Sequence, residues 1–295
     1  MPEGHSIHRL SRAFDELFGG TPLAASSPQG RFAAGAALLD GLPLTAAEAY
    51  GKQLFLGFGG TPTGPERWLR VHLGLYGAWT FTGTDSFAGP HAIGAPRRRI
   101  GEADTAVAGD TGSVDDDGRF VPPAPRGAVR LRLVGRDGCA DLTGPSACEV
   151  VTGPEKREVI AKLGPDPLRK DTGAAAEFAA RIRARRVAAG ALLMDQTVAA
   201  GVGNIFRAES LFLCGVNPYR PGRDVTDGEA RELWTTLARL MRRGVRTGTI
   251  NSTGRKTVPF FVYHRAGEPC LRCGTPVREA LMQARRLFWC PGCQP

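Results

Sequence analysis

The sequence predicts an α+β protein in which a helix and a β-rich region are followed by a helical half and a cysteine module. Short apolar stretches broken by Gly and Pro dominate the first half, as is typical of β-strands. From about residue 155 the apolar positions recur at helical spacing instead. Four cysteines in two Cys-x2-Cys pairs close the chain. At 295 residues the chain is long enough for two domains with separate cores.

Composition excludes several classes of protein. Apolar residues make up 42% of the chain and charged residues 23%, which is typical of a globular protein rather than a disordered one. No apolar run approaches the roughly 18 residues of a membrane span. The N-terminus, MPEGHSIHRL, lacks the apolar core of a signal peptide, so we expect a cytoplasmic protein.

The positive charge is concentrated in the second half of the chain. Residues 1–151 contain 14 Lys and Arg against 16 Asp and Glu, whereas residues 152–295 contain 24 against 13. A surface that follows phosphates needs such an excess of positive charge, because its cations replace condensed counterions. An arginine-rich, solvated face with no ligand is the alternative, and charge alone does not decide between the two.

The first half is expected to form a helix and then a β-sandwich or barrel. Ser6 is placed to cap a helix whose apolar positions have helical spacing: Ile7, Leu10, Phe14, Leu17 and Phe18. Strands are predicted at Gln53–Phe58, at Trp68–Leu73 and at the alternating Val129, Leu131 and Leu133. Between them, residues 101–127 are rich in Gly, Asp and Pro and include Asp115, Asp116 and Asp117, which predicts a weakly ordered surface loop.

The second half is expected to form a small helical domain. Apolar positions predict helices around Phe178 and Ile182, around Leu192 and Leu193, and across Ile205, Ala208, Leu211 and Phe212, with a turn at residues 200–203. Thr226 and Glu229 have the spacing of a capping box. A longer helix should therefore begin there, with Leu233, Leu237, Leu240 and Met241 on its buried face.

The closing cysteines have the spacing of a structural zinc site. Cys270 and Cys273 are followed after 16 residues by Cys290 and Cys293, which suits four thiolates around one tetrahedral ion. No ligand position is left for water, so the metal should be structural. A redox dithiol is the alternative. Arg285 and its neighbour Arg286 fall between the pairs, where a basic hairpin could grip phosphates. The other cysteines, Cys139, Cys148 and Cys214, are expected to be buried apolar residues.

Four motifs in order resemble the formamidopyrimidine-DNA glycosylase and endonuclease VIII family. They are MPEG, AYGKQLF, MDQTVAAGVGNIFRAESLF and CLRCG…ARRLFWCPGCQ, and they cover nearly the whole chain. The resemblance implies an N-terminal helix plus β-sandwich domain at residues 1–152 and a helix-two-turn-helix domain at 153–255. It also implies a β-hairpin zinc finger at 256–295.

The resemblance makes Pro2 the catalytic nucleophile once Met1 is removed. A terminal amine has an ordinary pKa of about 7.7–8, so a useful fraction is neutral near neutral pH. It would attack C1′ of the damaged nucleotide, expel the base and form a Schiff base, after which elimination breaks the strand. The alternative is that Pro2 reflects N-terminal processing alone.

The resemblance assigns further roles, each with a structural alternative. Glu3 would be the general acid or base at the sugar, or else a surface glutamate in the first turn of a helix. Lys52 would contact phosphate and assist catalysis, or else be an edge-strand lysine. Asn204 would bind phosphate, cap its helix, or do both. Arg285 would grip phosphates beside the flipped nucleotide, and Glu209 would brace the turn before Asn204.

The loop HLGLYGAW resembles the family's void-filling loop, with Leu75 and Tyr76 as intercalating residues. Gly74 stands where endonuclease VIII carries a longer polar side chain, so the third filler is missing. The alternative is that Leu75 and Tyr76 belong to a strand core. The region from Asp141 to Cys148 lacks the Arg-Arg-Phe-Gly stretch of the oxidised-purine branch, which favours oxidised pyrimidines as substrates and the endonuclease VIII branch.

The sequence therefore predicts a bifunctional DNA glycosylase and AP lyase of base-excision repair. Its expected partner is damaged double-stranded DNA, its one cofactor a structural zinc ion, and its form a cytoplasmic, nucleoid-associated monomer without an organic cofactor or a membrane. Three alternatives stay open: an oxidised-purine glycosylase, a non-catalytic damaged-DNA-binding zinc-finger protein, and a zinc-ribbon transcription or RNA-binding factor.

Overall fold

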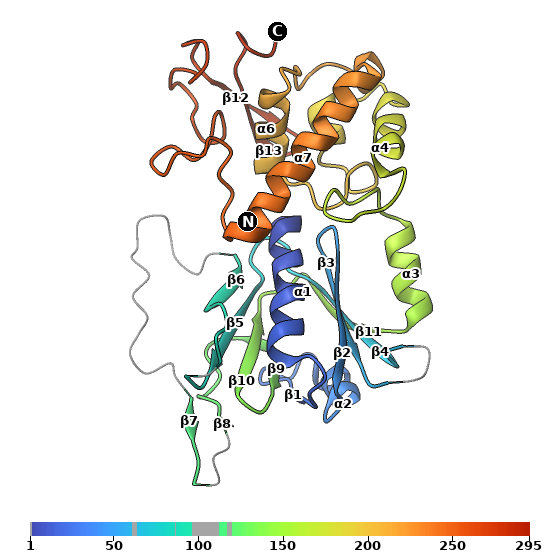
Figure 1. Ribbon diagram of the computed structural model, residues 1–295, viewed down its shortest axis with the longest axis vertical. Helices are drawn as coiled ribbons and strands as arrows, with labels where there is room; N and C mark the ends of the chain where they lie inside the picture. Colours follow the sequence, from blue (N-terminus) through green and yellow to red (C-terminus); the bar gives the residue numbers. More distant parts are fainter. Residues whose placement is uncertain (1, 61–63, 86, 96–111, 117–119) are drawn as a thin grey trace. The chain divides into compact units, whose positions relative to one another are not determined.

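The computed structural model describes residues 2–60, 64–85, 87–95, 112–116 and 120–295 (Figure 1). Contacts divide the chain into two compact units. The first contains Pro2 and Ser6–Val159, and the second contains Glu3–His5 and Ile160–Pro295. Across these described ranges, no helix combines the length and the apolar character needed to cross a bilayer.

The first unit is an antiparallel β-sandwich, as predicted. One sheet has the strand order β1-β9-β10-β5-β6 and the other has the order β11-β4-β3-β2. The strands are β1 Ala24–Ser26, β2 Leu44–Tyr50, β3 Gln53–Phe58, β4 Arg67–His72, β5 Ala78–Gly83, β6 Ala92–Gly94, β9 Val129–Val134, β10 Gly138–Thr143 and β11 Ala147–Val151. The three predicted strands are confirmed, β4 being shifted by one residue towards the N-terminus.

Helix α1 (Gly4–Phe18) supplies side chains to the core that both sheets share. The rings of Phe14 and Trp79 meet edge to face, with centroids 4.8 Å apart, and Phe81 lies 5.4 Å from the same phenylalanine. The helix therefore buries the apolar face that its spacing predicts. Two shorter helices, α2 (Ala33–Leu39) and α3 (Gly153–Ala161), are the other described helices that lie wholly or mostly in this unit.

The expected cap at Ser6 is wrong, because α1 already begins at Gly4. The N–H of Gly4 donates to the carbonyl oxygen of Gly201 at 2.8 Å. A distant carbonyl thus satisfies one of the N–H groups that a helix start leaves without an intrahelical partner, and the helix extends past the serine. No local pattern around Ser6 could indicate this partner, which lies almost 200 residues away.

The acidic loop predicted at 101–127 falls largely on residues outside the described ranges, Asp117 among them. Within the predicted loop, the described residues include a short antiparallel pair of strands, β7 (Ser113–Val114) and β8 (Phe120–Val121), which the expectation of a weakly ordered loop did not include.

The second unit is helical up to its cysteine module, as predicted. Its elements are α4 Ala174–Arg183, α5 Ala189–Leu192, α6 Asn204–Leu213, the 3-10 turn η1 Gly222–Asp224 and α7 Asp227–Thr247 (Figure 1). The capping box at the start of α7 is confirmed, because Thr226 accepts from the Glu229 backbone while the Glu229 side chain accepts from the Thr226 backbone. A core formed by the buried faces of these helices holds them together.

The chain ends in a two-stranded hairpin, β12 (Arg278–Met282) and β13 (Arg285–Trp289). A small core beneath it joins residues of α6, of the hairpin and of the cysteine pairs: Ala208, Phe212, Val262, Cys270, Val277, Phe288 and Cys290. This core explains why residues 160–295 form one compact unit. The division of this half into a helical domain and a finger at residue 255 stays a prediction.

Candidate active site and cysteine cluster

Glu3 lies at the N-terminus of α6. Its carboxylate accepts backbone hydrogen bonds from Gly203 (3.0 Å), Ile205 (2.9 Å) and Phe206 (3.5 Å), and the side chain is fully buried. The N-terminus of a helix attracts anions, because its N–H groups and its dipole both favour negative charge. Glu3 therefore acts as the cap of a helix that begins 201 residues later in the chain. This excludes the alternative of a surface glutamate.

Glycines allow this close approach. A Cβ atom at Gly203 would lie 2.4 Å from the Glu3 side chain, and one at Gly4 would lie 2.8 Å from Met241 and 2.9 Å from the Gly201 backbone. Real Cβ contacts are longer than this, so larger residues would push the carboxylate away from the helix. The glycines of MPEG and GVGN thus fix the position of Glu3.

Asn204 is buried at the first position of α6 and joins the helix to the hairpin. Its Nδ2 donates to the Arg286 carbonyl oxygen at 2.9 Å. Nη2 of Arg207 donates to the same oxygen at 3.0 Å and also to Oδ1 of Asn204. Gly203, and not Asn204, holds the N-cap position, and the side chain that accepts from the first N–H groups of the helix is that of Glu3. The alternative of a plain helix cap is therefore wrong.

Arg207 belongs to this cluster although sequence reasoning missed it. The side chain is fully buried, and burial lowers its pKa to about 10. Its Nε and Nη1 have no hydrogen-bond partner among the described residues. The signal was an arginine three residues after Asn204 in a predominantly apolar helix, a spacing that places both side chains on one face.

Tyr263 is the second residue that sequence reasoning missed. A side-chain hydrogen bond joins it to Asn204. Burial and then the negative charge of Glu3 raise the pKa of its phenol. A carboxylate, an amide, a phenol and a guanidinium therefore meet at the start of α6.

Glu209 was expected to brace the turn before Asn204, but its hydrogen bonds lie elsewhere. Its carboxylate accepts from the backbone N–H groups of Phe261 (2.9 Å), Val262 (3.0 Å) and Tyr263 (2.9 Å), and from the hydroxyl of Ser252. One fully buried anion thus anchors the segment that leads from α7 towards the cysteines.

In the first unit, Lys52 lies in the two-residue turn between β2 and β3, where Tyr50 pairs with Gln53. It is therefore a turn residue, and the expectation of a strand lysine is corrected. Its charge, after burial, lowers the pKa of His72 on β4, so the two side chains are neighbours. His72 Nδ1 also lies 2.6 Å from Ser146 Oγ.

Leu75 and Tyr76 lie at the turn between β4 and β5 and are 39% and 81% exposed. The alternative of strand-core residues is therefore wrong. Gly74 has φ +66°, and a Cβ there would lie 2.9 Å from Ser146. Backbone conformation and space both explain why a longer side chain is missing at that position.

Pro2 is buried and belongs to the first unit, while the residue that follows it belongs to the second. Met1 lies outside the described residues.

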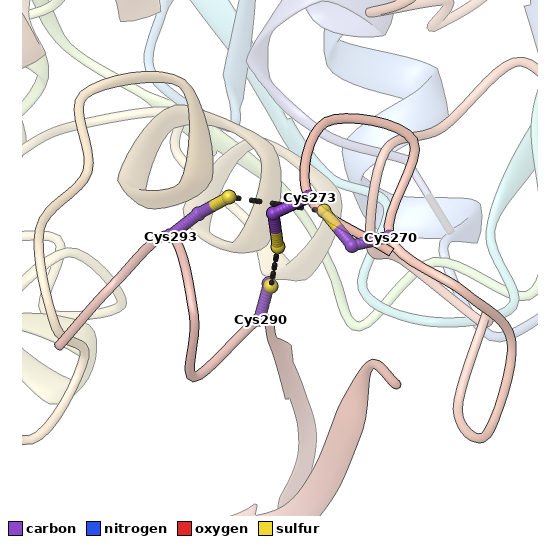
Figure 2. A group of neighbouring side chains, drawn as sticks. All are labelled: Cys270, Cys273, Cys290 and Cys293. Carbon is purple, nitrogen blue, oxygen red and sulfur yellow. Dashed lines mark hydrogen bonds between the residues drawn. The ribbon is translucent and has the colours of Figure 1, made fainter. Parts of the chain in front are cut away.

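The four C-terminal cysteines converge on one point (Figure 2). All four sulfurs lie within 4.8 Å of one another, with Cys270 and Cys293 3.8 Å apart and Cys273 and Cys290 3.5 Å apart. A tetrahedral ion with metal–sulfur bonds of about 2.3 Å would separate its sulfurs by about 3.8 Å. The residues therefore fit one four-coordinate metal ion.

Backbone geometry supports each cysteine pair. The N–H of Gly274 donates to the Cys270 carbonyl at 3.0 Å, and its φ of +76° suits glycine. At the second pair, the buried Gln294 accepts from the Cys290 N–H at 3.0 Å and donates to the Val216 carbonyl at 2.9 Å. The second pair is thereby tied to the chain just after α6.

Arg285 is the first residue of β13, directly after a two-residue turn. Gln283 and Ala284 form this turn with φ of 51° and 57°, which is the geometry of a type I′ hairpin. Beside it, Arg286 makes a two-pronged ion pair with Glu279 at 2.6 Å. The hairpin therefore presents two adjacent arginines.

Comparisons with known proteins agree with this arrangement. Residues 163–255 match the formamidopyrimidine-DNA glycosylase H2TH domain. The chain is 41% identical over 305 residues to Endonuclease 8 1 of Mycobacterium tuberculosis strain H37Rv, covering all of both chains. It is 31% identical to the formamidopyrimidine-DNA glycosylase of Laribacter hongkongensis, covering 88% of this chain and 84% of that protein.

Solved structures have the same fold. The Lactococcus lactis Fpg in complex with DNA containing an abasic site gives a TM-score of 0.75 at 19% identity and covers 99% of both chains. MutM in complex with DNA containing carbocyclic 8-oxo-G gives 0.74 at 19% identity, over all of both chains. The identity with Endonuclease 8 1 extends over the full length of the chain, so the chain belongs to the formamidopyrimidine-DNA glycosylase and endonuclease VIII family of base-excision-repair DNA glycosylase/lyases.

Proposed function

We propose that this enzyme excises oxidised bases, pyrimidines above all, from damaged double-stranded DNA and then cleaves the strand through a Schiff base on Pro2. One observation carries the proposal: Glu3 beside Pro2 is buried against the N-terminus of α6, in a chain that is similar to Endonuclease 8 1 over its full length. A non-catalytic DNA-binding protein would need Glu3 only as the cap of α6, whereas the proposed reaction also uses the amine of Pro2 beside it.

The reaction begins when the neutral amine of Pro2 attacks C1′ of the damaged nucleotide. A new N–C1′ bond forms and the glycosidic bond breaks, its electron pair leaving with the base. The nitrogen then loses its proton, the C1′–O4′ bond breaks with its electron pair going to O4′, which is protonated, and the opened sugar is held as the iminium. Removal of a proton from C2′ then expels the 3′ phosphate and breaks the strand. Glu3 would accept a proton from the sugar as an ionised carboxylate, the form that the backbone N–H groups at the start of α6 favour.

Other side chains would bind the DNA. Asn204 and Arg285 are proposed phosphate contacts in the second unit, and Lys52 is one in the first. The exposed Leu75 and Tyr76 would fill the space that a flipped base leaves.

The four cysteines would hold one structural zinc ion, because four thiolates at tetrahedral separations suit zinc and leave no open ligand position. When bound, the ion would cross-link the two cysteine pairs and would supply no chemistry at the lesion. We also propose that the enzyme acts as a monomer on nucleoid DNA.

Oxidised purines are the second candidate substrate class. Several relatives between 31% and 38% identical are named formamidopyrimidine-DNA glycosylases, which favours this alternative. Matched duplexes that differ only in carrying an oxidised thymine or 8-oxoguanine separate the two. Faster excision of the thymine lesion is expected, and faster excision of the purine would reverse the assignment.

Borohydride trapping tests the proposed reaction. The enzyme with Pro2 at its terminus should form a covalent complex with an abasic duplex after reduction of the iminium. The same chain behind a cleavable N-terminal tag should form none, because Pro2 is then an amide, and tag removal should restore trapping. A tagged protein that traps as well as the cleaved one would rule out Pro2, and a cleaved protein that never traps would favour a binding protein.

A further inference from the structure

His264 has a backbone conformation that histidine rarely adopts. Its φ is 57°. The backbone N–H of the next residue, Arg265, donates to the Val262 carbonyl oxygen at 3.1 Å, so His264 is the third residue of a four-residue turn. That position with positive φ favours Gly or Asn. Strain of this kind persists where the surroundings maintain it, frequently at functional sites.

The surroundings of His264 hold its ring in a fixed place. The imidazole stacks on the ring of Tyr263 with centroids 4.3 Å apart and planes 16° apart, and it lies 5.2 Å from the Phe288 ring. The backbone of Tyr263 is itself anchored, because its N–H donates to Glu209 at 2.9 Å. The histidine nevertheless remains exposed, so part of its ring faces solvent.

This ring belongs to the cluster that contains the proposed phosphate contacts. Tyr263 shares a side-chain hydrogen bond with Asn204. Arg286, which follows Arg285 in the sequence, has its guanidinium 5.0 Å from the centroid of the Phe288 ring. His264 is therefore the exposed end of an aromatic stack that reaches back to Asn204.

We infer that His264 contacts DNA, with an imidazole N–H donating to a backbone phosphate of the strand that Asn204 and Arg285 hold. The inference rests on the proposed function, since DNA is the assumed ligand. Glycine would adopt this backbone conformation without strain, yet the chain has a histidine there. A phosphate contact explains why a side chain with an N–H donor is needed at this position.

The contact should depend on pH. Partial burial and the nearby Arg286 lower the pKa of His264, while Glu279 opposes this. Tyr263 is the remaining titratable group against the ring, and its pKa is raised. A bound phosphate adds negative charge and favours the protonated imidazole, so the affinity for DNA should increase as pH falls through the range in which the imidazole gains its proton.

Glycine at this position separates the contact from a structural role. Binding is measured by fluorescence anisotropy on a duplex with a non-cleavable abasic analogue, across pH. H264G should bind about tenfold more weakly at the acidic end, as expected for one lost charge-assisted hydrogen bond. Its Tm should equal or exceed that of the native enzyme, because glycine relieves the strain. H264N, which tolerates the turn and keeps a neutral donor, should lose less affinity and should lack the pH dependence.

The exposed His91 in the first unit provides the matched control, and H91A should bind as the native enzyme does. Equal affinities of H264G and native enzyme at every pH would overturn the inference. Weaker binding together with a lower Tm would overturn it too, by assigning His264 a structural role. Borohydride trapping at saturating abasic duplex should succeed in H264G. If the native enzyme forms no borohydride-trapped complex, the proposed function is disproved instead. Binding of native enzyme and H264G to undamaged duplex, measured by anisotropy, would then still test the phosphate contact.

Discussion

At the residue scale, Glu3 has a structural role at the start of α6 in addition to its proposed chemical role. Both of its carboxylate oxygens accept backbone N–H groups, so the contacts that place Glu3 at the start of α6 also satisfy it in a buried position, where its charge interacts with that of Arg207. An amide in its place has one acceptor oxygen, and its NH2 group would face a backbone donor.

E3Q should therefore lose both stability and activity. One buried N–H would lose its acceptor, which costs about 1–3 kcal/mol. Urea denaturation measures the first effect, and excision of a damaged base at saturating DNA measures the second. E16Q, on the exposed face of α1, is the matched control and should change neither. An E3Q enzyme that is as stable and as fast as the native one would contradict both roles.

His72 makes the stability of the first unit depend on pH. Burial, then Lys52 and Arg70, lower its pKa below the usual 6.5. Between the lowered value and 6.5 the unfolded chain binds more protons than the folded one, so stability is present above 6.5 and is lost as pH falls. The free energy of unfolding should fall more between pH 7 and about pH 5.5 in the native enzyme than in H72N. Parallel pH profiles would show that His72 makes no contribution.

Several site residues could be predicted from the sequence and others could not. Motifs were sufficient to bring the four cysteines together, because their spacing is diagnostic. The resemblance singled out Glu3, but its contacts with the start of α6 were not predictable because they lie about 200 residues away. Arg207 and Tyr263 gain their place from a carboxylate and a carbonyl far away in the chain, which no local pattern encodes. Ser6 was misassigned for the same reason.

At the scale of elements, periodicity predicted well wherever one face of an element is buried. Strand β9 and the start of α7 were correct, because alternation and a capping box are local signals. Lys52 was assigned to a strand although it lies in a turn, since a two-residue turn leaves little trace between two apolar runs.

The turn between β12 and β13 stores strain that substitution should release. Gln283 and Ala284 both have positive φ, whereas Asn-Gly is the favoured pair in such a turn. Gln283→Asn combined with Ala284→Gly should raise the free energy of unfolding by about 1 kcal/mol. Guanidinium denaturation measures this, and the DNA affinity at fixed salt should stay unchanged. Lower stability would show that the native pair makes contacts that compensate for its strain.

At the scale of the whole molecule, a division of the chain into two halves could be predicted from the sequence. The assignment of residues near the N-terminus to the second unit could not. A composition change near residue 155 indicates the main boundary, which contacts place after Val159. Nothing in the sequence shows that Glu3–His5 belong with residues 160–295. That assignment depends on the tight fit of Gly4 against Gly201.

Metal removal should loosen the end of the second unit and leave the sandwich intact. Cys270 and Cys290 share a small core with Val262, Val277 and Phe288, so loss of the ion removes the cross-link that holds it. Hydrogen exchange on the full chain after verified chelation should rise across residues 262–294 and stay constant in β2–β4. C214S, outside the cluster, should retain the metal. Unchanged exchange after metal loss would show that the core holds without it.

The most direct test of the account is to locate the atom that becomes bonded to DNA. The borohydride-reduced complex with an abasic duplex is digested with nuclease and trypsin, and the modified peptide is sequenced by mass spectrometry. We expect the sugar remnant on the N-terminal nitrogen of the peptide Pro2–Arg9, with Met1 absent. An adduct on Lys52 or any other lysine, with an unmodified Pro2, would contradict it.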